Sequence, residues 1–345
     1  MRLLLEEVIA ADPRLSLAGS CADAEAALTF LKANRPDVVS MDILLPGIDG
    51  VEAIRRILAE QALPIVVISS TASCSESRHA MEALHAGALA ALPKPEGPDS
   101  PDFEKHCRRI ADQLVAMSQV RVIRRMRTRA DNPAPRLAPS EPAAPLAISA
   151  AAPGRPVGTE VVGIAASTGG PIALVDLLGA LPADYPLPIL LVQHIAPGFA
   201  VSFAEWLDGS VPPAVACAVD GETVRPGRVY LAPDGRHLAL RGGRVALLDT
   251  PPSGVHKPSA NVLFESLARE CGPRAAGVIL TGMGRDGAEG LAAMRRAGAW
   301  TCGQNEESCA VFGMPQAARD AGAVDELLST TEISRRLASL RVCPK

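Results

Sequence analysis

Aromatic side chains are scarce in this chain, and no charge of one sign dominates it. Phe, Trp and Tyr make up only 3% of the 345 residues, so few stacking platforms exist for single-stranded nucleic acid. The formal net charge of −4 gives no overall basic surface for DNA. We therefore expect no nucleic-acid partner.

Long apolar runs are also missing. None approaches the ~20 residues needed to cross a bilayer. The first residues, MRLLLEEVIAADP, carry two glutamates inside the apolar stretch, which argues against a secretory signal. The eight cysteines are scattered without a CxxC pair, which favours free thiols over disulfides or a metal site. We expect a cytoplasmic protein without membrane insertion, acting as a monomer.

What the chain does have is alternation between strand and helix patterns in two blocks. With 48% hydrophobic residues and enough length for two cores, it predicts an α/β protein with two doubly wound parallel-sheet domains. The first domain is assigned to residues 1–118 and the second to 159–345. Residues 119–158, rich in Pro and Ala with an arginine cluster from Arg121 to Arg129, predict an extended linker.

The first block predicts four strands and five helices. The strands are expected at 15–19, 37–42, 64–69 and 88–92, and the helices at 2–11, 22–34, 51–60, 75–86 and 102–118. In the second block the strand patterns are VVGIAA, PILLVQH, RVYLAP, ALLDT and AGVILTG. Helices are expected to begin near Pro171, Gly198, Ser259, Asp286, Pro315 and Thr331.

The segment VVGIAASTGG, residues 161–170, predicts a buried strand followed by a sharp turn into a helix. Its two final glycines permit the turn, and Pro171 suits the first helical turn. Ser167 would then stand at a strand end beside unpaired helix amides, as a nucleophile next to an anion-stabilising site. A dinucleotide site is disfavoured because the segment lacks both GxGxxG and GxxxxGK[ST].

A serine nucleophile needs a base and a group that orients it. His194 follows the strand pattern ILLVQ, and Asp286 follows AGVILTG, so all three residues lie at carboxyl ends of predicted strands, where ligand sites gather. His237 and His256 are the other histidines of this block, with a structural or exposed role as the default. The alternative for Asp286 is that it merely caps the next helix.

The second block resembles the catalytic domain of chemotaxis protein-glutamate methylesterases. The resemblance is carried by VVGIAASTGG and PILLVQH together with VYLAPDGRHL, HKPSANVLF, LTGMGRDGAEG and ESCAVFGMPQAA. The resemblance implies hydrolysis of glutamate γ-methyl esters, and deamidation of certain glutamines, on methyl-accepting chemoreceptors, with no cofactor for the esterase. It makes Ser167 the nucleophile, His194 the base and Asp286 its orienting partner, and it places Thr168 and Met283 at the oxyanion pocket. Two departures stand out. Ile195 replaces a methionine, and Asn261 replaces an aspartate.

The first block resembles response-regulator receiver domains of the flavodoxin-like type. DVVSMDILLPGIDG places Asp42 at the phosphoacceptor position, with Ser69 and Lys94 at the supporting hydroxyl and ammonium positions. The resemblance implies a chemotaxis histidine kinase as phosphodonor, Mg²⁺ as the cofactor of phosphorylation with Asp42 among its ligands, and a receiver that covers the active face until it is phosphorylated.

The receiver's usual first strand, which ends in an acidic pair, is not found before the first helical pattern. Glu6 and Glu7 lie in that helix and substitute poorly for a pair in a loop, so the Mg²⁺ site is expected to be weak. Two explanations stay open: an upstream start codon, or a degenerate receiver. A second hypothesis for the whole chain is a phosphorylation-dependent scaffold whose hydrolase domain is inactive.

Overall fold

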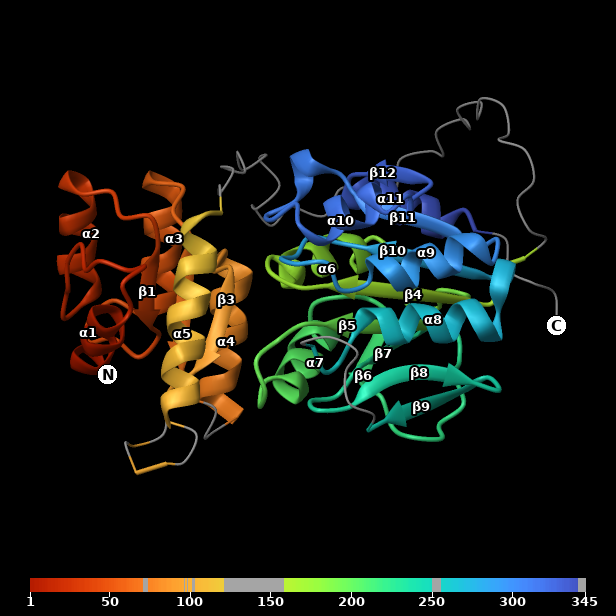
Figure 1. Cartoon of the computed structure of the whole chain (residues 1–345), viewed down its shortest axis with the longest axis horizontal. Coiled ribbons are helices and arrows are strands. Elements are labelled where there is room, and N and C mark those ends of the chain that lie inside the picture. The colour runs from red at the N-terminus through yellow and green to blue at the C-terminus, as the bar shows by residue number, and fades with distance from the viewer. Residues whose placement is uncertain are drawn as a thin grey trace, which may run out of the picture.

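The computed structural model describes residues 1–70, 74–95, 97, 99–100, 103–120, 158–249 and 256–340. Most of the expected linker, from residue 121 to residue 157, lies outside the described residues, as does its arginine cluster. Within the described part, the chain forms two α/β units, each built on a parallel sheet (Figure 1).

The first unit has a three-stranded parallel sheet in the order β1-β2-β3, flanked by helices. Its strands are β1 (Val39–Asp42), β2 (Ile65–Ser69) and β3 (Ala90–Pro93). Its helices are α1 (Arg2–Ala11), α2 (Ala24–Ala33), α3 (Gly50–Glu60), α4 (Cys74–Ala86) and α5 (Phe103–Ser118). Every residue of β2 is buried, as expected for the central strand of a covered parallel sheet.

The expected strand at 15–19 is wrong. These residues belong to no strand, and β1 pairs only with β2 within the described chain. A strand exists through the ladder of hydrogen bonds it makes with a neighbour, and no described strand lies beside residues 15–19. The apolar pattern LSLAG therefore remains unpaired.

The second unit has a seven-stranded sheet in the order β12-β11-β10-β4-β5-β7-β6, and all its named strand pairs are parallel. The strands are β4 (Val161–Ala166), β5 (Ile189–Gln193), β6 (Ala214–Cys217), β7 (Arg228–Leu231), β10 (Ala275–Ile279), β11 (Trp300–Gln304) and β12 (Glu326–Leu328). A two-stranded antiparallel hairpin, β8 (His237–Arg241) and β9 (Arg244–Leu248), stands beside this sheet, so the expected strand in ALLDT forms part of a hairpin.

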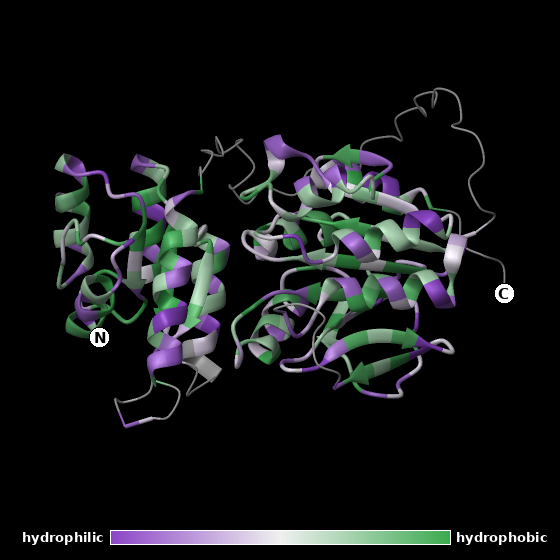
Figure 2. Cartoon of the chain, viewed as in Figure 1, coloured by the Kyte–Doolittle hydropathy of each residue, from purple (hydrophilic) through white to green (hydrophobic). Residues whose placement is uncertain are grey.

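The helices of this unit are α6 (Gly170–Leu178), α7 (Ala200–Asp208), α8 (Ala260–Glu270), α9 (Ala288–Arg296), α10 (Met314–Asp320) and α11 (Thr330–Ala338), with short 3-10 helices η1 (Gly272–Arg274) and η2 (Glu306–Ser308). Each α-helix begins within two residues of its expected start. The hydrophobic residues gather in the strands and along the inner helix faces (Figure 2). The two parallel sheets confirm the predicted fold class.

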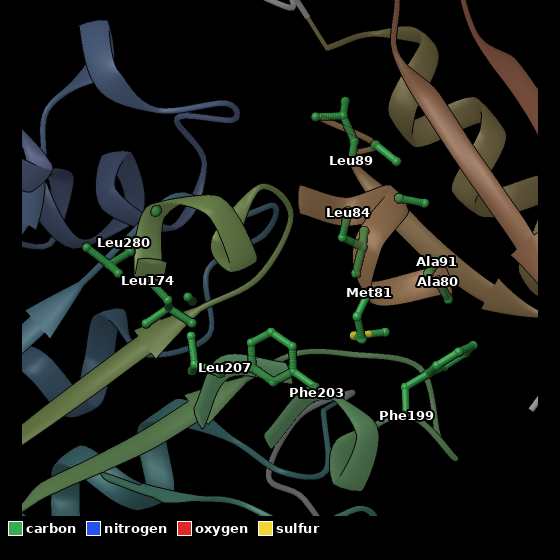
Figure 3. Close-up of a cluster of buried hydrophobic side chains, with 14 of the residues drawn as sticks. Ala80, Met81, Leu84, Leu89, Ala91, Leu174, Phe199, Phe203, Leu207 and Leu280 are labelled. Carbon is green, nitrogen blue, oxygen red and sulfur yellow. The ribbon is translucent and has the colours of Figure 1, made fainter. Parts of the chain in front are cut away.

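The two units pack against each other through helix α4 of the first and helices α6 and α7 of the second. Met81 and Leu84 of α4 are buried in one hydrophobic cluster with Phe203 and Leu207 of α7 (Figure 3). At its edge the rings of His85 and Trp206 lie 5.8 Å apart. Among the described helices, none is long and apolar enough to cross a membrane.

Candidate functional site

Ser167 occupies the turn between β4 and α6, directly after the last residue of the central strand. Its amide donates to the carbonyl of Thr281 (3.0 Å), and its own carbonyl accepts from the Gly170 amide (2.8 Å). Gly169 caps α6 with φ +75°, a left-handed conformation that favours glycine. The predicted strand-turn-helix arrangement around the serine is therefore present.

The loop after β10 closes on this serine. A Cβ atom added at Gly282 would lie 2.7 Å from Ser167 Cβ and would also collide with the Met314 side chain. Only a glycine allows the Gly282 backbone to approach this closely. The contact brings the neighbouring Met283 to the same edge of the sheet as Ser167.

His194 follows β5, which is paired with β4 so that Gln193 stands opposite Ala166. The His194 amide donates to the Ala166 carbonyl at 2.9 Å. The amide nitrogen of Gln193 donates to the carbonyls of both Ser167 (2.8 Å) and His194 (2.9 Å). One buried side chain thus connects the serine turn to the histidine.

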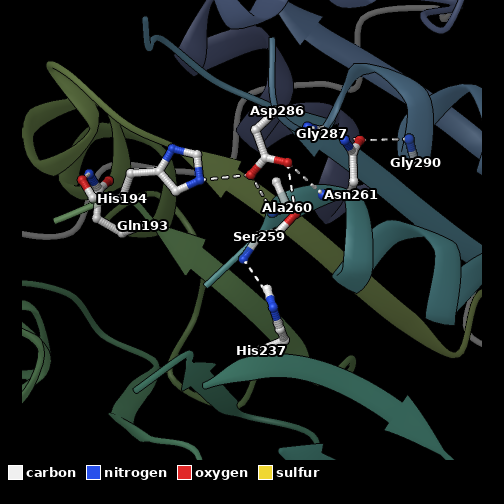
Figure 4. A network of polar contacts seen from close by, with 9 residues as sticks. All are labelled: Gln193, His194, His237, Ser259, Ala260, Asn261, Asp286, Gly287 and Gly290. Carbon is white, nitrogen blue, oxygen red and sulfur yellow. Dashed lines mark hydrogen bonds and ion pairs between the residues drawn. The ribbon is translucent and has the colours of Figure 1, made fainter. Parts of the chain in front are cut away.

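His194 and Asp286 form a direct, largely buried pair. Nε2 of His194 lies 2.9 Å from Oδ2 of Asp286, and the two side chains are only 9% and 10% exposed (Figure 4). The other ring nitrogen, Nδ1, is buried and has no hydrogen-bond partner among the described residues. Because Asp286 occupies Nε2, Nδ1 is the nitrogen left to accept a proton.

The Asp286 carboxylate is surrounded by hydrogen-bond donors from the start of α8. Oδ1 accepts from Ser259 Oγ (2.8 Å) and the Asn261 amide (3.2 Å), while Oδ2 accepts from the Ala260 amide (2.7 Å). Burial raises the pKa of Asp286, but the hydrogen bond and the charge of His194, followed by the hydrogen bonds from Ala260 and Ser259, outweigh it and lower the pKa to about 2. The carboxylate therefore stays ionised opposite His194.

The alternative prediction, that Asp286 caps the next helix in the chain, is wrong. The Asp286 side chain does not cap α9, the next helix, which begins after Gly287 without a capping bond from that residue. Oδ1 of Asn261 instead accepts from the amides of Gly287 (3.0 Å) and Gly290 (2.8 Å) at the start of α9. Asp286 thus binds the start of α8, while Asn261 caps α9 with a neutral oxygen.

Two further histidines lie close to the pair. The His256 ring stacks on the His194 ring, with centroids 4.2 Å apart and planes 10° apart. Burial, and then the nearby His194, lower the pKa of His256, which favours its neutral form. His237 is fully buried, and its Nδ1 accepts from the Ser259 amide at 3.1 Å. Both histidines make structural contacts at the site, which agrees with the structural role expected for them by default.

Thr168 and Met283 each adjoin the contact between Ser167 and Gly282. Thr168 follows the serine in the turn, and its carbonyl accepts from Thr281 Oγ1 at 2.9 Å. In the part of the chain that the structure describes, neither the Thr168 amide nor the Met283 amide donates to a backbone acceptor. Two unused N–H groups beside a serine have the chemistry of an oxyanion site.

The polar residues expected in the first unit also meet at strand ends. Lys94 Nζ lies 2.7 Å from Asp42 Oδ2, and both side chains are mostly buried. Ser69, buried at the end of β2, accepts the Lys94 amide with its carbonyl at 2.9 Å. Asp42, Ser69 and Lys94 therefore lie together, with a positive charge beside the carboxylate.

The surroundings of Asp42 fit a magnesium site poorly. No group of three or more His, Cys, Asp or Glu side chains that could hold a metal occurs among the described residues. The Asp42 carboxylate is itself paired with Lys94. Mg²⁺ prefers several oxygen ligands, so the described residues supply an incomplete set.

Comparison with known proteins identifies both units. The CheB methylesterase family model matches residues 162–337, and the response regulator receiver domain model matches residues 1–100. A protein-glutamate methylesterase/protein-glutamine glutaminase of Anaeromyxobacter dehalogenans is 47% identical over 98% of this chain and 95% of its own length. One from Myxococcus xanthus is 45% identical over 98% and 93%.

A solved structure supports the same assignment for the second unit. The crystal structure of the Thermotoga maritima CheB methylesterase catalytic domain is 35% identical and superimposes with a TM-score of 0.51. It covers 53% of this chain and 98% of that domain.

Sequence reasoning missed Ser259, His256 and Gln193 as parts of the site. One signal was available, since a serine directly before the helical pattern ANVLFESL is a typical helix N-cap. That signal predicts a cap and says nothing of a contact with Asp286, which lies 27 residues further along the chain.

Proposed function

The chain belongs to the CheB methylesterase family and carries a response regulator receiver domain, and we propose that it hydrolyses glutamate γ-methyl esters on methyl-accepting chemoreceptors. By the same route it deamidates specific receptor glutamines. The observation that carries the proposal is the buried His194–Asp286 pair at the strand end beside Ser167, in which His194 Nδ1 has no hydrogen-bond partner among the described residues.

In the proposed mechanism, Ser167 Oγ attacks the ester carbonyl carbon and passes its proton to His194 Nδ1. Asp286 remains ionised and stabilises the imidazolium that forms. The amides of Thr168 and Met283 stabilise the negative oxygen of the tetrahedral intermediate. His194 then returns the proton to the leaving methoxide, and methanol departs from an acyl-enzyme on Ser167.

Water completes the cycle. His194 removes a proton from it as its oxygen attacks the acyl carbon. His194 then passes that proton to Ser167 Oγ as the acyl bond breaks, which restores the hydroxyl and the neutral imidazole. The products are a glutamate side chain and methanol. From a glutamine side chain the same steps release ammonia in place of methanol.

The receiver is proposed to control access to this site. Asp42 accepts a phosphoryl group from a chemotaxis histidine kinase, with Lys94 beside it to balance the charge. Helix α4 packs on α6 and α7, the helices that follow Ser167 and His194 in the chain. Covering this side of the catalytic unit would restrict a large receptor substrate, and phosphorylation would relieve it. Because the carboxylate set near Asp42 is incomplete, no step of the proposal depends on Mg²⁺.

The direct test is methanol release from methylated receptor by the full chain, with and without a small-molecule phosphodonor. Ser167→Ala should lower the rate by several orders of magnitude and keep the fold. A scaffold with an inactive hydrolase domain would release no methanol, and a Ser167→Ala rate close to the original would reject the assignment of the nucleophile.

A further inference from the structure

Asp286 depends on more than His194 for its orientation. Its two oxygens are bound by different sets of donors: Oδ1 by Ser259 and Asn261, and Oδ2 by Ala260 and His194. Two of these donors are main-chain amides, which a side-chain substitution would leave in place. The Ser259 hydroxyl is the side-chain donor that binds the oxygen facing away from His194.

The side chain of Ser259 does not cap the helix at whose N-terminus it lies. Ser259 is the N-cap residue of α8, where a serine hydroxyl ordinarily accepts a hydrogen bond from the first turn of its own helix. Here it makes no such bond. The Asp286 carboxylate accepts the amides of Ala260 and Asn261 instead, and the Ser259 hydroxyl donates to that carboxylate (Figure 4).

A second buried residue, His237, binds the main chain of Ser259. The Ser259 amide donates to Nδ1 of His237, which is completely buried at the start of β8. A continuous chain of contacts therefore runs from His237 through Ser259 and Asp286 to His194 (Figure 4). The bond to His237 fixes the backbone of Ser259, and so the position from which its hydroxyl reaches Asp286.

We propose that Ser259 is a positioning residue of the hydrolase: its hydroxyl fixes the rotation of the Asp286 carboxylate so that Oδ2 faces His194 Nε2. Without this bond, the carboxylate can turn about its Cβ–Cγ bond, and His194 loses the partner that keeps Nδ1 free of a proton. Turnover should fall because the base is misoriented, while substrate binding is unaffected.

The test compares kcat and KM for methanol release by the full chain. We expect Ser259→Ala to lower kcat by about tenfold and to leave KM within about twofold. Ser259→Thr keeps the hydroxyl and should restore most of the rate. The matched control is Ser266→Ala on the same helix, which removes a buried hydroxyl that donates to the Leu263 carbonyl and accepts from the Leu240 amide. It loses two buried hydrogen bonds away from Asp286 and should leave kcat within about twofold.

Ser259→Cys guards against a variant that fails to fold, because it keeps nearly the same volume but donates only weakly. Its kcat should lie between those of the original chain and Ser259→Ala. An unchanged kcat in the Ala or Cys variant would overturn the proposal. So would an equal loss in Ser266→Ala, or a Thr variant no better than Ala.

This inference rests on the proposed function, so one measurement is made without substrate. The NMR signal of the His194 Nε2 proton lies downfield while it is bonded to Asp286, and Ser259→Ala should move it upfield or broaden it. If the original chain released no methanol, the proposed function would fail while this signal still tested Ser259. An identical signal in Ser259→Ala would refute the positioning role alone.

Discussion

Replacing Asp286 by Asn removes a charge with almost no change of shape. The carboxylate accepts hydrogen bonds from four donors. An asparagine offers one acceptor oxygen and places an NH₂ group against the remaining donors. If that NH₂ group faces His194, Nε2 becomes an acceptor and the ring proton moves to Nδ1, the nitrogen that has to receive the proton of Ser167.

Two magnitudes follow. The wrong tautomer should lower kcat by about 10⁴-fold. The lowering of the Asp286 pKa from its usual 3.8 to about 2 corresponds to roughly 2 kcal/mol of folding free energy, at ~1.4 kcal/mol for each pH unit. For a unit of this size the loss should lower the Tm at pH 7 by roughly 4–8 °C.

The pH dependence has a definite sign. Because folding lowers the pKa of Asp286, its contribution to stability is complete above about pH 4 and disappears as the pH falls toward 2. The Tm difference between the original chain and Asp286→Asn should therefore be full at pH 7 and shrink below pH 4. Calorimetry of both proteins across this range measures it.

The control is Asp320→Asn, which changes an exposed aspartate that pairs with its neighbour Arg319 and should leave both rate and Tm unchanged. The reasoning is refuted if Asp286→Asn keeps more than a tenth of the rate. It is equally refuted if the Tm difference persists undiminished at low pH.

Three other substitutions test separate parts of the account. Gly282→Ala should cost about 100-fold in methanol release with the fold retained, because its Cβ would lie 2.7 Å from Ser167 Cβ; a rate within threefold of the original would contradict this close packing. Met81→Lys places a charge in the buried α4–α7 contact, so methanol release without phosphodonor should rise several-fold, and an unchanged rate would contradict control by covering. Lys94→Met removes the ammonium 2.7 Å from Asp42 and should lower phosphoryl incorporation from a small-molecule donor by roughly tenfold, with the unphosphorylated rate as its control; normal incorporation would exclude a role for Lys94.

The positions of Ser167, His194 and Asp286 could be predicted because each follows an apolar strand pattern. Parallel strands share one carboxyl edge, so residues that follow different strands meet there regardless of their separation in the chain. The hydrophobic pattern cannot show which ring nitrogen of the histidine is used. The structure shows that Asp286 binds Nε2 of His194 and that Nδ1 has no hydrogen-bond partner among the described residues.

Other parts could not be predicted, for physical reasons. Strand β11 was not predicted from the sequence because two of its residues, Thr301 and Gln304, are polar although they are fully buried. The Thr301 hydroxyl donates to Asp325, and the Gln304 side-chain oxygen accepts from the Thr281 amide. The roles of Ser259 and His256 depend on how the start of α8 meets the loop after β10, which local pattern does not encode. Residues 15–19 carry a strand pattern, but a strand also needs a neighbour, and the described chain provides none.

The central claim, that Ser167 is a nucleophile activated by His194 and Asp286, is tested most directly by covalent labelling. The full chain would be treated with a fluorophosphonate, which reacts with activated serines, and the modified residue would be located by mass spectrometry. We expect one label per chain, on Ser167, and a labelling rate that falls by orders of magnitude in Asp286→Asn. No label on Ser167, or equal labelling of the Asp286→Asn variant, would contradict it.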